Sequence, residues 1–355
     1  MYNVFTDFHQ SSLLNSLIIL FEKRLSGNIY RPIGTTWHDL GYWKIYEHPS
    51  TVQQFLGIGG ATPDGTRKLN EVTSTTPEAD PIYNCYDIDS DRTNKAITHS
   101  RFMSEQIDLV IASIPDHIEP FRRLCDSHPS KPKLIYQIGN AWNIGDDLQK
   151  HVDGIMASAK LNRVPSVPFI EYHQEFDTNI FKPQNLDPVR KIGSFVNCFN
   201  VDALFVDDWH LFTACEKLAP HWKFEAFGGQ CRDGAAHGSK QLSQFMNECE
   251  FIWHTKNGGD GYGHVIHNAA AVGKPIICKL EYYRGKLAEK LLRDGETAIV
   301  IDGLNAQEVI NKIEYFSDRN RYNEMCKMTA INFNIVVDFN TEATNIKNWL
   351  QNVLT

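Results

Sequence analysis

Short apolar runs alternate along the chain with segments whose apolar residues recur every three or four positions. Residues 3–7 form such a run, and residues 13–24 have the helical spacing, with apolar side chains at 13, 14, 17, 18, 20 and 21. Short runs are typical of buried strands, and the three-to-four-residue spacing is typical of helices. The same pattern predicts further strands at 28–32, 109–113, 134–137, 155–158 and 167–170.

A second series of strands and helices begins at residue 191. Strands are expected at 191–196, 223–227, 251–253, 275–278 and 298–301, and helices at 208–218, 240–247, 285–294, 305–316, 319–329 and 341–354. Alternation in two blocks predicts an α/β protein with two parallel-sheet domains and helices on both faces of each sheet. Ligands of such sheets bind at the carboxyl ends of the strands, so we expect the site in a cleft between the domains.

Residues 260–277 read as a glycine turn, a short helix, a glycine stop and a buried strand. Glycines in and before the turn let the backbone approach a ligand closely. The N–H groups at the start of the helix suit an anion such as a diphosphate. The ligand-binding residues predicted here are Gly259, Gly261, Tyr262, Gly263, His264 and Asn268.

Composition narrows the class of protein. A chain of 355 residues suggests two domains, and 42% hydrophobic with 22% charged residues is typical of a soluble globular protein. The net charge of −8 weighs against broad binding to nucleic acid or anionic membranes. No apolar run approaches the ~20 residues of a membrane span. The chain enters a strand directly, without a signal peptide, and its eight cysteines are scattered, so we expect reduced thiols in a cytoplasmic protein.

Two segments carry a family resemblance. The run 260–277 resembles the C-terminal signature of retaining, two-Rossmann (GT-B) glycosyltransferases of group 1: an acidic residue, Gly-aromatic-Gly, a second acidic residue eight positions after the first, then Ala-x-Ala-x-Gly-x-Pro. Asp260 and Asn268 occupy the two acidic positions. Residues 176–183 resemble the interdomain connection Val-Asp-x-x-x-Phe-x-Pro of that family, and residues 108–117 and 5–9 resemble its N-terminal domain more loosely.

The resemblance implies two Rossmann-like domains facing across a cleft. Residues 1–180 would bind the acceptor, residues 181–335 would bind the nucleotide sugar, and a helix within 336–355 would cross back to the N-terminal domain. The implied reaction moves a sugar from a UDP- or GDP-sugar to a hydroxyl of a small-molecule or glycan acceptor, with retention of configuration. No permanently bound cofactor and no metal ion are expected.

The family pattern also implies roles for individual residues. Asp260 would approach the donor sugar and Asn268 the ribose, where the amide keeps an acceptor oxygen but lacks the charge of the family carboxylate. An ordinary helix residue is the alternative for Asn268. Asp260 could also cap the helix that follows, a role that is compatible with sugar binding.

Lys256 could neutralise the leaving diphosphate in place of a metal. The family places part of an Arg and Lys pair on the first strand of its C-terminal domain, where residues 193–197 contain no basic side chain, and Arg232 is a second candidate. A solvated lysine is the alternative. His117 would contact the donor sugar or cap a loop, and His9 would orient or deprotonate the acceptor hydroxyl or simply begin a helix.

Other patterns leave alternatives open. His264 and His267 have the spacing of a metal pair but no third ligand is apparent. Alternation places Glu171, His173 and Glu175 on one side of an extended segment, which would line the cleft or form the polar face of a hinge. Residues 57–81 are expected to form a long recognition loop, and the aspartates of 87–91 a solvated turn.

Other functions remain possible on the same grounds. The chain could transfer a sugar to a hydroxymethylated base in DNA, although its acidity disfavours a nucleic-acid partner. It could be an epimerase or a phosphorylase on a related scaffold. It could also be a non-catalytic nucleotide-sugar-binding protein, because both carboxylate positions of the signature are altered.

Overall fold

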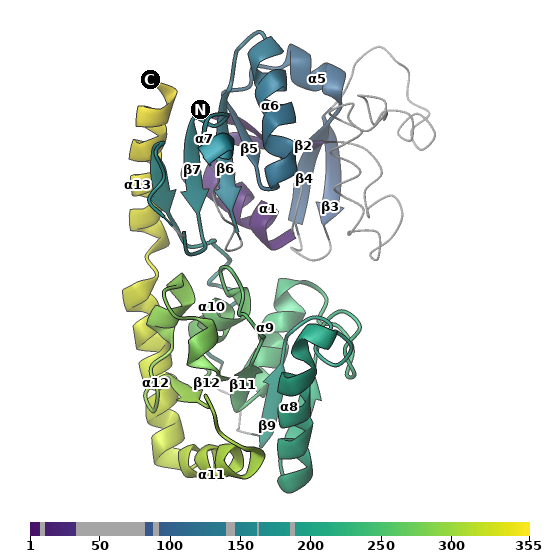
Figure 1. Ribbon diagram of the computed structural model, residues 1–355, viewed down its shortest axis with the longest axis vertical. Coiled ribbons are helices and arrows are strands. Elements are labelled where there is room, and N and C mark those ends of the chain that lie inside the picture. The colour runs from purple at the N-terminus through teal and green to yellow at the C-terminus, as the bar shows by residue number, and fades with distance from the viewer. Residues whose placement is uncertain (8–10, 33–81, 88–91, 140–145, 162, 185–188) are drawn as a thin grey trace. The chain divides into compact units, whose positions relative to one another are not determined.

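The computed structural model describes residues 1–7, 11–32, 82–87, 92–139, 146–161, 163–184 and 189–355 (Figure 1). The chain divides into two compact units, here called unit 1 (Met1–Phe176 with Phe339–Thr355) and unit 2 (Asp177–Asp338). His9 and the predicted loop at 57–81 lie outside the described residues.

Unit 1 contains an eight-stranded sheet with the order β3-β4-β2-β1-β5-β6-β7-β8. Its strands are β1 Asn3–Thr6, β2 Asn28–Pro32, β3 Tyr83–Asp87, β4 Arg92–Ile97, β5 Leu109–Ala112, β6 Lys133–Ile138, β7 Gly154–Ala157 and β8 Phe169–Glu171. All pairs are parallel except β3 with β4. Strands β2 to β4 lie on one side of β1 and strands β5 to β8 lie on the other, so the strand order reverses between β1 and β5.

Helices cover both faces of this sheet. They are α1 Ser11–Ile18, continued by the π-helix η1 Ile19–Arg24, and α5 His99–Ser104, α6 Pro115–Ser127, α7 Asp146–Gln149 and α13 Phe339–Leu354. Phe5 and Val110 face the apolar cluster under α6, whereas Val4 and Ile111 face the cluster under α1 and α13. Strand alternation therefore divides the apolar residues between two cores.

The last helix, α13, packs on the sheet of unit 1. Ile346, Trp349, Leu350 and Val353 are buried in the same cluster as the strands, and Figure 1 shows the helix beside the sheet of unit 1. A Cβ at Gly154 of β7 would lie 2.8 Å from the Trp349 ring. The close fit of this helix on the sheet therefore depends on glycine at position 154.

Unit 2 contains a five-stranded parallel sheet with the order β10-β9-β11-β12-β13. The strands are β9 Lys191–Ser194, β10 Lys223–Ala226, β11 Phe251–His254, β12 Ile276–Cys278 and β13 Ala298–Val300. The helices are α8 Val206–Leu218, α9 Gly238–Glu248, α10 His264–Ala271, α11 Ala306–Phe316 and α12 Arg319–Val336, with the 3-10 turns η3 Ala203–Phe205, η4 Leu280–Tyr282 and η5 Leu287–Leu291. The strand order reverses between β9 and β11.

The predicted α/β class is confirmed, and the structure differs from the prediction in local elements. The helix expected at 285–294 is only the 3-10 turn η5. An antiparallel edge strand, β3, accompanies the parallel strands of unit 1, and Asp87 ends that strand opposite Arg92. Among the described residues, no helix is both long and apolar enough to cross a membrane.

Candidate functional site

The glycine turn predicted from the sequence leaves the sheet of unit 2 at its carboxyl edge. Strand β11 ends at His254, residues 255–263 form the turn, and α10 begins at His264. Strand β11 lies beside β9, where the strand order reverses. Sheets of this class bind ligands outside the carboxyl ends of the strands at such a reversal. The turn therefore occupies the position in unit 2 where a ligand is expected.

Three glycines give the turn its shape. Gly258, Gly259 and Gly263 have φ angles of 74°, 65° and 85°, in the left-handed region that favours glycine. A Cβ at Gly259 would overlap the carbonyl oxygen of Tyr282 and lie 2.7 Å from Nζ of Lys286, whereas a Cβ at Gly258 would meet no described residue within 4 Å. Glycine at 259 is therefore required by close packing as well as by backbone conformation.

Asp260 is clamped within the turn. Nε2 of His254 lies 2.9 Å from its Oδ2, and the ammonium group of Lys256 contacts its Oδ1. The side chain of Asp260 is 20% exposed, while His254 is almost fully buried. Burial acts to raise the pKa of Asp260, but the hydrogen bond and charge of His254 and the charge of Lys256 outweigh it and hold the pKa below its ordinary value. At neutral pH Asp260 is therefore an ionised carboxylate that His254 and Lys256 hold in one position.

The alternative role of Asp260 as a helix cap is wrong. The N-cap of α10 is Gly263, which offers no side chain, and Asp260 bonds to β11 and the turn instead. The N-terminal end of an α-helix carries a partial positive charge that favours anions. The geometry of the turn thus places a helix N-terminus, a lysine and a carboxylate together.

Two aromatic residues support this helix end. The ring of Tyr262 stacks on that of His267 with centroids 4.1 Å apart, and Nδ1 of His267 donates to the carbonyl of Gly263 at 2.9 Å. Burial lowers the pKa of His264 to about 4, with the charge of Asp260 acting in the opposite direction. Among the described residues, no group of three or more His, Cys, Asp or Glu side chains is arranged to hold a metal.

Asn268 lies one turn into α10 with only 6% of its surface exposed. Its Oδ1 is buried and accepts no hydrogen bond from any residue that the structure describes. A buried polar atom normally has a partner, because losing hydrogen bonds to water is costly. The unused acceptor is suited to a donor group on a ligand.

The two basic candidates differ in their surroundings. Lys256 is 34% exposed and bonds to Asp260 at the turn. Arg232 bonds to Glu216, Asp233 and the carbonyl of Phe224, and its guanidinium lies over the ring of Trp209. These contacts give Arg232 a structural role at the end of β10, so Lys256 is the stronger candidate.

His117 lies near the start of α6 in unit 1 and is only 3% exposed. Its Nδ1 lies 3.1 Å from Oδ2 of Asp7, which also accepts hydrogen bonds from the Ser113 backbone N–H and hydroxyl at 2.8 and 2.6 Å. A carboxylate only accepts, so Nδ1 donates to Asp7 and Nε2 lies on the other side of the ring. Asp7 and Ser113 follow β1 and β5, where the strand order of unit 1 reverses.

The polar residues before the interdomain connection do not alternate as expected. Glu171 is exposed, but residues 172–176 are all buried. His173 bonds to Glu342 of α13 through both its backbone N–H and its ring, and Glu175 bonds to Arg24 at 3.0 Å. His173 and Glu175 therefore tie this segment to α13 and η1 within unit 1.

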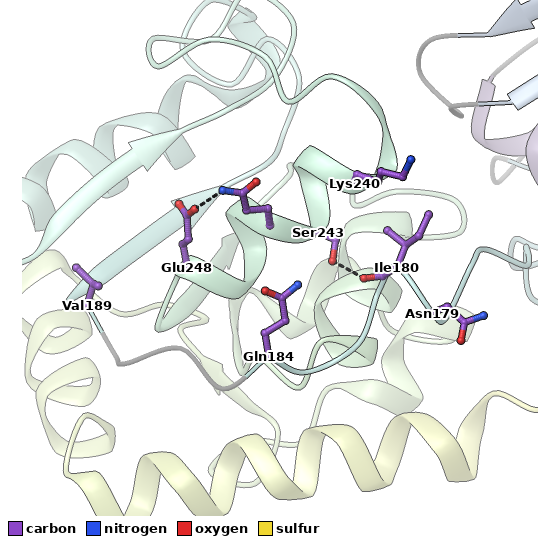
Figure 2. Close-up of a pocket in the computed structure, with 8 residues that line it drawn as sticks. Asn179, Ile180, Gln184, Val189, Lys240, Ser243 and Glu248 are labelled. Carbon is purple, nitrogen blue, oxygen red and sulfur yellow. Dashed lines mark hydrogen bonds between the residues drawn. The ribbon is translucent and has the colours of Figure 1, made fainter.

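A cavity of about 690 Å³ lies elsewhere in unit 2, between the segment 179–184 and α9. The hydroxyl of Ser243 on α9 donates to the carbonyl of Ile180 at 2.7 Å. Figure 2 shows this bond, with Lys240 and Glu248 at the cavity wall. Asn247 adds hydrogen bonds to the Gln184 backbone N–H and the Lys182 carbonyl. None of the residues of the glycine turn lines this cavity. The residues that line it hold the segment 179–184 against α9.

Sequence reasoning missed His254. It is the last residue of a buried strand, 1% exposed, and it contacts Asp260, which lies six positions further along the chain. The available signal was its place directly before the glycine turn, at the carboxyl end of β11.

Comparison with known proteins identifies the fold. No protein-family model and no curated protein sequence matches the chain. Solved structures do match over almost the full length: HepE of Anabaena in complex with UDP and glucose (12% identity, 99% of each chain, TM-score 0.64), a glycosyltransferase of Rickettsia africae (10%, 100% of this chain and 99% of that one, 0.60), and the pneumococcal O-GlcNAc transferase GtfA in complex with UDP and GlcNAc (11%, 99% and 98%, 0.58). The chain therefore has the GT-B glycosyltransferase fold.

Proposed function

We propose that this protein transfers a sugar from a nucleotide-sugar donor to an acceptor hydroxyl, and that unit 2 binds the donor. The observation that carries the proposal is the glycine turn at the carboxyl edge of β11, where a helix N-terminus, Lys256 and the fixed carboxylate of Asp260 meet. Two matching structures of the same fold hold UDP, so a UDP-sugar is the first donor to test and a GDP-sugar the second.

Each polar group of the turn has a chemical task in this proposal. The N-terminus of α10 and Lys256 stabilise the departing diphosphate, which would make a metal ion unnecessary. Each carboxylate oxygen of Asp260 has two acceptor positions, and the protein contacts at His254 and Lys256 leave others for sugar hydroxyls. Asn268 accepts a hydrogen bond from a ribose hydroxyl through the buried oxygen that has no partner among the described residues.

Unit 1 is proposed to bind the acceptor. His117 would contact the sugar or the acceptor through Nε2, while Asp7 fixes which ring nitrogen carries the proton. The resemblance of residues 260–277 to a retaining family supports retention of anomeric configuration.

Thermal shift against a panel of UDP- and GDP-sugars tests the function. A ligand that binds only the folded state stabilises it by about 2.7 kcal/mol at 100 times its Kd, so the correct donor should raise Tm measurably.

Slow hydrolysis of that donor without acceptor would distinguish an enzyme from a non-catalytic binding protein. Proton NMR of the product reports the anomeric configuration, and activity that persists in EDTA supports metal independence. The absence of any shift or hydrolysis across the panel would overturn the proposal.

Asn268→Ala is expected to weaken donor binding by roughly 2- to 10-fold, the range of one lost hydrogen bond. The ligand-free variant should keep its Tm, since Oδ1 has no hydrogen-bond partner among the described residues to lose. Titration of the donor by calorimetry measures the effect, and Asn334→Ala on the exposed side of α12 is the control. An unchanged donor affinity would remove Asn268 from the site.

A further inference from the structure

The loop that follows β12 lies directly on the glycine turn. Nζ of Lys286 donates a hydrogen bond to the carbonyl of Gly258 at 2.7 Å. The carbonyl of Tyr282 occupies the space beside the α-carbon of Gly259. The turn is thus covered on one side by a second segment, which brings an ammonium group with it.

This loop is anchored at several points away from the turn. Nζ of Lys279 lies 2.7 Å from Oδ1 of Asp208, a side chain that is only 1% exposed, and 3.2 Å from the hydroxyl of Tyr282. The backbone N–H groups of Leu280 and Glu281 each donate to Asp302 at 2.9 Å. Buried ion pairs and paired backbone groups resist displacement, so the loop holds its position on the turn.

The charges around the glycine turn indicate what the ammonium group of Lys286 can bind. Residues 193–197, at the end of β9, contain no basic side chain, and the Lys256 ammonium already contacts Asp260. Lys286 brings a second positive charge to the same turn, where its ammonium group donates to the Gly258 carbonyl and lies over the ring of Tyr283. Phosphate oxygens accept stronger hydrogen bonds from an ammonium group than a carbonyl does.

We propose that Lys286 binds the diphosphate of the donor from the side of the β12 loop, and that Asp208 and Lys279 are positioning residues for it. This inference rests on the proposed function of the turn. It adds a residue outside the 260–277 signature, on a loop that the sequence pattern assigned to a helix.

Calorimetric titration with UDP, or with GDP if UDP does not bind, tests the proposal on the full chain. Lys286→Gln removes the charge but can still donate to the Gly258 carbonyl, and it should weaken binding of the nucleoside diphosphate by about 10- to 100-fold. Lys286→Arg keeps the charge and should lose much less of the affinity for the nucleoside diphosphate. The nucleoside alone, titrated by saturation-transfer NMR, should bind both proteins with similar affinity because it lacks phosphate.

The control is Lys290→Gln, an exposed lysine four residues further along the same segment, which should bind like the wild type. If the affinity for UDP changes less with salt concentration in Lys286→Gln than in the wild type, this would support the loss of a charge contact. An affinity within 2-fold of wild type, or an equal loss for the nucleoside, overturns the role of Lys286 while the proposed function stands. A wild-type protein that binds neither UDP nor GDP overturns both.

Discussion

Asp260→Ala is expected to lower the rate of sugar transfer by about 100-fold or more, with unit 2 still folded. Removing one preorganised electrostatic group from an active site typically costs a factor of about 100 to 1000 in kcat. Asp260 is such a group, because His254 and Lys256 fix both of its oxygens before any substrate binds. Steady-state kinetics with the donor found by thermal shift would measure kcat and KM separately.

Two further variants separate catalysis from folding. His254→Gln can still donate to Asp260 and should keep a larger fraction of the activity, whereas the exposed control Glu296→Ala should behave like the wild type. Because the folded pKa of Asp260 is depressed, its stabilising contribution is present at neutral pH and is lost only as the pH falls below about 4. The Tm difference between wild type and Asp260→Asn should therefore shrink in acid. Full activity of Asp260→Ala would exclude the assignment.

The strands of both sheets could be predicted because nearly all are buried runs in parallel sheets. Residues 109–112 and 251–254 show this: the apolar run itself marks the strand. The antiparallel edge strands β3 and β4 were not predicted, because their sequence is mostly polar. Asn94 of β4 is buried as a hydrogen-bond partner of Arg31, not as an apolar core residue. Pro120 lies inside helix α6, and since proline usually ends a helix, the stretch before residues 134–137 could be predicted only as helical or polar.

The helix predicted at 285–294 fails for a tertiary reason. Leucines 287, 291 and 292 have helical spacing, but the hydroxyl of Thr297 donates to the carbonyl of Leu291 and accepts from the N–H of Arg293. These bonds turn the chain after one short 3-10 segment.

The candidate site was predictable in position and not in its contacts. The spaced motif located Asp260 and Asn268, yet no sequence pattern indicates that Asp260 bonds back to His254 or that the β12 loop lies on Gly258. Those contacts join segments of the chain that lie close together because of how the strands of the sheet are arranged.

Gly259→Ala is expected to disrupt the turn far more than Gly258→Ala. Both residues have a positive φ, so each alanine costs about 1–2 kcal/mol of backbone strain. At 259 the added methyl group also overlaps the Tyr282 carbonyl and crowds Lys286, which adds about 1–3 kcal/mol or displaces the β12 loop. At 258 the methyl group points into open space, which makes this variant a matched control.

Thermal unfolding and nucleotide titration would measure the contrast. For a unit of this size about 1 kcal/mol corresponds to roughly 2–4 °C in Tm, so Gly258→Ala should lose a few degrees and Gly259→Ala about twice as much. Affinity for the nucleoside diphosphate should fall sharply only in Gly259→Ala, because only that change moves the β12 loop and Lys286 from the turn. Equal effects of the two alanines would mean that the contact of this loop with Gly259 does not shape the site, and that backbone conformation alone explains the glycines.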